Sequence, residues 1–150
     1  MSESKPLTID RRSYDLGIIF AFGEMVHVGL KKLALSAPMA PEEMDGLMDE
    51  AQRIAQLNQV ELYRETDFLV TDLFPAEVTA GKHVFLIYQG LTKQEYLDLK
   101  AEKARLVQAG QYHGAARREI ARRFGRLLSY PDETIDSMLE ARLSIQGTIE

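Results

Sequence analysis

Five consecutive apolar residues, Val84-Phe-Leu-Ile-Tyr88, constrain the fold of this chain more than any other stretch. An amphipathic helix or a half-exposed strand would interrupt such a run with polar side chains. A short uninterrupted run of aliphatic, β-branched and aromatic residues is instead typical of a strand that is covered on both faces. The sequence therefore predicts a sheet whose interior strand lies within residues 82–89.

Two further segments, residues 60–64 and 67–74, are rich in β-branched and aromatic residues and predict two more strands. Pro75 and Gly81 bracket a seven-residue loop between the second of these segments and residues 82–89. Because no helix-length segment separates these two strands, we expect them to pair antiparallel. The pattern does not fix whether residues 60–64 lie at one edge of the sheet or at the other.

Helical periodicity occupies the chain before the strands. Residues 13–36 predict a helix that is apolar on more than one side, although residues 16–22 also fit a short strand. Pro38 and Pro41 break this pattern, and residues 41–58 then predict a second helix that carries several methionines. A helix that is apolar on several sides is usually central to a core or to an interface. We therefore expect a homodimer that forms through these two helices.

Three more helices are expected after the strands. Thr92 and Glu95 have the spacing of a capping box, and Gly110 suits a C-terminal stop. The predicted helices span residues 92–110, residues 112–128 and the chain from residue 132 onward. The chain is thus expected to be an α+β domain, in the order helix, helix, three strands, three helices, with a small antiparallel three-stranded sheet packed against about five helices.

Length and composition fit one globular domain. A chain of 150 residues with 45% hydrophobic residues and a net charge of −5 has enough apolar surface for a core. We expect residues 13–150 to form that domain behind a flexible arm, residues 1–12. The absence of cysteine excludes disulfides, thiol catalysis and cysteine-ligated metals. The charge-free apolar stretches are far shorter than the roughly 20 residues that span a bilayer, and the polar start lacks the pattern of a secretory signal, so we expect a cytoplasmic protein.

Glu24 and His27 are the first candidate site residues, because they lie three apart and share one face of a predicted helix. This is the spacing of half a di-metal carboxylate site, but the chain holds no second E-x-x-H. The other interpretation is a partly buried histidine that is bonded to Glu24. Asp72 is a third candidate, since a carboxylate among apolar neighbours in a half-buried strand needs a partner. Arginine is the expected partner, with a ligand-binding or catalytic role as the alternative.

The strongest charge feature is a group of five arginines between residues 117 and 126. Arg118, Arg122 and Arg126 recur every four residues, so they line up along one side of a helix and repel one another. Three interpretations stay open: pairing with the chain's own acids in residues 42–50 or 132–136, binding of a small phosphorylated or carboxylate ligand, or exposure to solvent. The acidic total argues against broad nucleic-acid binding.

Several familiar signatures are absent. The chain has no phosphate-binding G-x-x-x-x-G-K-[ST], no G-x-G-x-x-G, no G-x-S-x-G and no H-E-x-x-H. With three histidines in all, a histidine-rich metal site is not expected, and no cofactor is indicated. His83 and His113 are interpreted as surface residues.

The segment Phe124-Gly-Arg-Leu-Leu-Ser-Tyr-Pro131 resembles the G-R-L-L-x-Y-P segment of a prokaryotic family of uncharacterised proteins. The resemblance covers about residues 82–140. In that family the segment follows a unit of a short strand and a charged helix, and a cysteine pair usually comes next. Here Asp132-Glu-Thr stands in that place. The resemblance implies a fold expectation and no activity.

These observations favour a non-catalytic binding or interaction protein. Its apolar, methionine-bearing helical face would meet a partner or a small ligand, and Arg118, Arg122 and Arg126 would orient an anion. The main alternative is a small enzyme with a pocket of Glu24, His27 and Asp72, aided by a divalent metal. A nucleic-acid-binding protein is the third hypothesis.

Overall fold

A computed structural model describes the chain from residue 4 to residue 149, with side chains as far as Arg142. Its centre is an antiparallel sheet of three strands in the order β1-β3-β2. The strands are β1 (Leu33–Leu35), β2 (Glu61–Glu65) and β3 (Val84–Tyr88). The predicted α+β class and the small antiparallel sheet are confirmed.

The interior strand β3 lies where the apolar run predicted it. All five of its residues are buried, because helices cover both faces of the sheet. Val84, Leu86 and Tyr88 belong to one core, whereas Phe85 and Ile87 belong to the other. The alternation of a strand thus distributes one apolar run between two separate cores.

Helices from the first third of the chain form one layer. α1 (Arg11–His27) packs on β1 and β3 and against α3 (Met48–Leu57), and the short α2 (Pro41–Asp45) precedes α3. Ile19, Val26 and Met44 are buried in this core with Phe85 of β3. Met39 and Met44 are 1% and 0% exposed, so both are enclosed by their own chain. Met48, the other methionine of the predicted second helix, is half-buried, and the homodimer stays a prediction.

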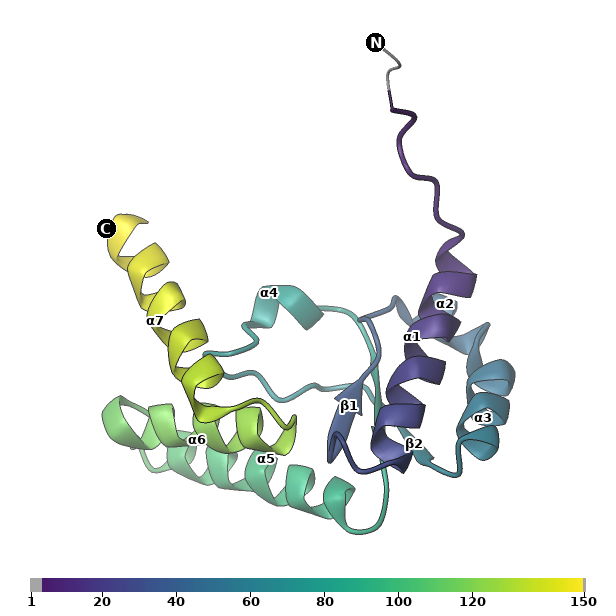
Figure 1. Ribbon diagram of the computed structural model, residues 1–150. Helices are drawn as coiled ribbons and strands as arrows, with labels where there is room; N and C mark the ends of the chain where they lie inside the picture. Colours follow the sequence, from purple (N-terminus) through teal and green to yellow (C-terminus); the bar gives the residue numbers. More distant parts are fainter. Residues whose placement is uncertain (1–3, 150) are drawn as a thin grey trace.

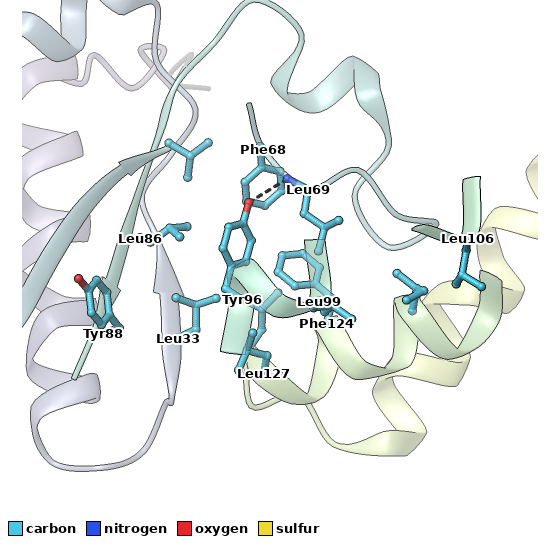
Figure 2. Close-up of a cluster of buried hydrophobic side chains, with 13 residues drawn as sticks. Leu33, Phe68, Leu69, Leu86, Tyr88, Tyr96, Leu99, Leu106, Phe124 and Leu127 are labelled. Atoms are coloured by element: carbon cyan, nitrogen blue, oxygen red, sulfur yellow. Dashed lines mark hydrogen bonds between the residues drawn. The ribbon is translucent and has the colours of Figure 1, made fainter. Parts of the chain in front are cut away.

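Helices from the last third form the opposite layer (Figure 1). α5 (Thr92–Gln108) packs against α6 (Gly114–Leu127), and α6 packs against α7 (Asp132–Ile149). Figure 2 shows the core of this layer, in which Tyr96, Phe124 and Phe68 meet the side chains of the sheet. Tyr96 and Phe124 have no exposed surface, and their ring centroids are 6.1 Å apart.

One predicted helix ends much earlier than its periodicity indicated. α1 stops at His27 because Gly29 adopts φ +83°, a left-handed conformation in which a glycine closes a helix. The amide of Leu30 then donates to the carbonyl of Met25 at 2.9 Å. Since the helix ends here, the chain is free to form β1, which pairs with β3. The predicted helix over residues 13–36 is therefore confirmed as far as His27 and wrong beyond it, and the alternative short strand over residues 16–22 is wrong.

The predicted strand over residues 67–74 is also wrong, because its backbone is held by side chains of α5. The amide of Leu69 donates to the Tyr96 hydroxyl at 2.9 Å, and the carbonyl of Val70 accepts from Lys103 at 2.7 Å. The alternating apolar residues anchor an irregular segment that leads into the single turn α4 (Ala76–Thr79). The sheet has three strands as expected, but β1 replaces this segment as the third.

Several predicted ends of helices are corrected as well. Arg11 and Arg12 belong to α1, not to the predicted arm, because Asp10 accepts the amide hydrogen of Ser13 at 3.1 Å and caps the helix. Residues 41–58 form two helices rather than one. Thr92 does not make the expected capping box, since it is the first residue of α5 and Leu91 is the cap.

Candidate functional site

The arginine side of α6 faces the first turns of α7. Arg122 donates to Asp136 through two nitrogens, at 3.2 and 3.0 Å, and Arg118 lies 3.9 Å from the same carboxylate. Arg126 donates to Asp132 at 3.0 and 3.4 Å. This pairing within the chain was the first of the three interpretations of the arginines. The arginines of the predicted anion site therefore already face the carboxylates of Asp132 and Asp136.

Asp72 has the arginine partner that the sequence indicated. Arg117 donates to both of its carboxylate oxygens, at 2.9 and 2.6 Å. The hydrogen bond from Arg117 lowers the pKa of Asp72, against the opposing effect of burial. The Arg117 guanidinium also lies over the ring of Tyr112, 5.3 Å from its centroid. The ion pair between Asp72 and Arg117 therefore connects the irregular segment after β2 to α6.

The three residues of the predicted pocket do not come together. Glu24 and His27 lie exposed near the C-terminal end of α1, on one face of the sheet. Asp72 is bonded to α6, which covers the other face. His27 is not a buried histidine bonded to Glu24, since its Nδ1 lies 3.4 Å from the side-chain nitrogen of Gln89. Among the described residues, no group of three His, Asp or Glu side chains is placed to hold a metal.

Glu65, at the end of β2, carries a buried carboxylate that the sequence pattern did not indicate. It is 3% exposed and accepts from the Tyr96 hydroxyl at 2.8 Å and from Lys100 Nζ at 3.1 Å. Its other oxygen accepts from the amide of Asp67 at 2.9 Å. Burial and the bond to Glu65 raise the pKa of Tyr96. Because Tyr96 has no exposed surface, these groups hold residues 66–70 in place rather than meet a substrate.

An apolar pocket of about 180 Å³ lies beside β1. It is enclosed by the edge of the sheet, the end of the first helix and its following turn, α4, and the turn between α6 and α7. Its lining residues are Phe22, Lys31, Leu35, Ser36, Pro38, Phe68, Phe74, Val78, Thr79, Val84, Leu128 and Tyr130.

The one charged side chain in this lining is Lys31. Its Nζ donates to the carbonyl of Leu128 at 2.9 Å. The same nitrogen lies 5.1 Å from the ring centroid of Tyr130 and 5.6 Å from that of Phe22. Burial lowers the pKa of Lys31. The pocket therefore combines an apolar interior with a half-buried ammonium group in its wall.

Sequence reasoning missed Lys31 because residues 13–36 were assigned to one helix, on which this lysine is an ordinary polar position. Gly29 was the available signal, since a glycine near the end of a helix often stops it. The other pocket residues are spread from Phe22 to Tyr130, so no local pattern connects them.

None of the described helices is long and apolar enough to cross a membrane. No protein-family model, curated protein or solved structure matches this chain. The resemblance of residues 82–140 to a prokaryotic family thus stays a prediction.

Proposed function

We propose that this protein is a non-catalytic binding domain that holds a small, largely apolar ligand in the pocket beside β1. The observation that carries the proposal is the pocket itself, an apolar space of about 180 Å³ at the edge of a well-packed sheet. Ligand sites are typically concave, lined by apolar and aromatic side chains, and supplied with few polar groups.

The volume supports a ligand whose buried part is no larger than one ring. An engineered cavity of about 150 Å³ lined by apolar side chains binds benzene. The pocket of about 180 Å³ fits one six-membered ring or a short branched chain. Phe68, Phe74 and Phe22 supply aromatic surfaces to such a group.

The polar groups in the lining support binding rather than nucleophilic chemistry. The Ser36 hydroxyl accepts from the amide of Phe85 at 2.9 Å and donates to the carbonyl of Ala37 at 3.0 Å. A hydroxyl whose proton is already donated to a carbonyl has no base to activate it. Ser36 therefore supports the turn after β1.

α4 provides the wall with the fewest buried contacts. It has a single turn and no buried residue, and Val78 within it is 41% exposed. Elements with few buried apolar contacts are those that open at low free energy. Displacement of α4 is the expected route by which a ligand enters.

The proposal is tested by titrating ¹⁵N-labelled protein with cyclohexylmethanol and following amide shifts. Binding in the pocket should move the amides of Ser36, Val78 and Val84 first. Val78→Trp should fill the pocket and abolish these shifts, whereas Glu77→Trp, on the same turn but outside the lining, should leave binding intact. Equal binding by both variants, or shifts confined to other surfaces, would refute a ligand site here.

A further inference from the structure

We infer that the ligand carries one carboxylate and that Lys31 binds it through the wall of the pocket. This inference rests on the proposed function and specifies its ligand class: a monocarboxylate with one ring or a short branched chain.

The Lys31 ammonium group has more donors than its surroundings use. An ammonium carries three N–H donors. Within the described part of the chain, its contacts are the carbonyl of Leu128 and the faces of two aromatic rings. A carbonyl and two rings stabilise a cation but do not neutralise it. A half-buried charge without a counter-ion is unfavourable, and a ligand carboxylate supplies that counter-ion.

Lys103 provides the comparison. It is also half-buried, donates to the carbonyl of Val70, and lies 5.2 Å from the ring centroid of Tyr112. Burial and the nearby Arg117 lower the pKa of Lys103, and Asp67 and Asp72 act in the opposite direction. For Lys31 burial is the one cause of the lowered pKa, with no acidic side chain acting against it. Among the residues whose side chains the structure describes, acids thus act on the half-buried Lys103 but not on the lysine of the pocket.

The position of Lys31 also fixes how the ligand lies. The lysine shares the lining with Leu128 and Tyr130, at the turn between α6 and α7, whereas Val78 belongs to α4. A carboxylate bonded to Nζ leaves the ring to contact the apolar lining. One ammonium balances one negative charge, and about 180 Å³ holds one ring. A monocarboxylate of this size satisfies both limits.

Three ligands of nearly equal size distinguish the contribution of the charged head group from that of the apolar ring. They are cyclohexanecarboxylate, cyclohexylmethanol and cyclohexylmethylammonium. We expect the wild-type protein to bind the carboxylate at least about 10-fold more tightly than the alcohol, since a charge-assisted hydrogen bond contributes about 1.5–3 kcal/mol and 1.4 kcal/mol is a factor of ten. The ammonium ligand should bind weakest. This comparison uses the unaltered chain, so it does not depend on how any variant folds.

The role of Lys31 is tested with Lys31→Met, and Lys103→Met is the matched control. Lys31→Met should reduce carboxylate binding to the level of the alcohol while alcohol binding is unchanged, and Lys103→Met should leave both affinities unchanged. Equal wild-type affinities for carboxylate and alcohol, or a preference that survives Lys31→Met, would overturn the inference and leave the apolar site standing. Absence of binding by all three ligands would overturn the proposed function itself.

Discussion

The hydroxyl of Tyr96 connects three parts of the chain, so its removal has a calculable effect. It accepts the amide hydrogen of Leu69 at 2.9 Å (Figure 2). It also donates to Glu65 at 2.8 Å, and Tyr96 has no exposed surface. Tyr96→Phe removes one oxygen and keeps the ring that packs on Phe124. The change therefore isolates two hydrogen bonds from the aromatic packing.

The expected cost is worked from these two bonds. A buried amide left without an acceptor costs about 1–3 kcal/mol, and a hydrogen bond to a charged group contributes about 1.5–3 kcal/mol. Lys100 stays beside Glu65 at 3.1 Å, which reduces the second cost. We expect Tyr96→Phe to lower the free energy of unfolding by about 3 kcal/mol, a large part of the roughly 5–15 kcal/mol that a domain has.

Urea unfolding followed by circular dichroism measures this free energy, and amide hydrogen exchange shows where the structure loosens. Tyr63→Phe is the control, since Tyr63 lies half-buried on the edge strand β2 and shares the same side-chain chemistry. It should change stability by less than about 0.5 kcal/mol. Exchange at Leu69 should accelerate in Tyr96→Phe alone. A loss below about 1 kcal/mol, or one equal to that of Tyr63→Phe, would refute the reasoning.

Three further changes test the backbone and the charges. Gly29→Ala should lower the free energy of unfolding in urea by about 1–2 kcal/mol, because φ is +83° at this position. A Cβ there meets nothing within 4 Å, so no clash adds to this cost. Gly17→Ala, within α1 and equally open, should be neutral or stabilising. Gly125→Ala should lower the melting temperature through about 1–3 kcal/mol of overpacking, since its Cβ would lie 2.6 Å from an isoleucine side chain of α7. The hydrogen bond from Arg117 lowers the pKa of Asp72 below its ordinary 3.8. As the pH falls, the unfolded state therefore binds this proton before the folded state does, and the protein loses stability below about pH 4. Asp72→Asn should flatten this part of the pH profile of unfolding, and an unchanged slope would contradict it.

The interior strand could be predicted because its signal is local, whereas its partner could not. Val84 to Tyr88 has no polar residue, which limits it to a strand covered on both faces. β1 has three residues, Leu33–Leu35, too few to show a period. The stop at Gly29 is a local feature, but the pairing with β3 that makes these residues a strand depends on the tertiary structure.

The arginine pairs show the same division between local and tertiary information. The stripe along α6 and the acids after Pro131 are plain in the sequence. Which acids meet the stripe depends on how α7 crosses α6, and that crossing depends on Gly125, which lets Ile135 approach closely. The pocket is still less predictable, because its lining is collected from loops and ends of elements.

The pocket exists because the chain leaves the sheet edge early. After Leu35 the pairing with β3 continues only through Ser36 and an isolated bridge between Met39 and His83. The apolar side chains beside this gap therefore line a pocket of about 180 Å³ that opens toward solvent.

Stability measurements with and without ligand separate a binding site from a packing defect. In both cases Val78→Trp should raise the melting temperature, since the indole covers apolar lining that is otherwise exposed to solvent. If the pocket is a binding site, a ligand at 100 times its Kd should stabilise the wild-type protein by about 2.7 kcal/mol, or about 5–11 °C for a domain of this size. The filled variant should then be the more stable protein without ligand and gain nothing from it. If the pocket is a packing defect, Val78→Trp should still have the higher melting temperature, but ligand should change the melting temperature of neither protein.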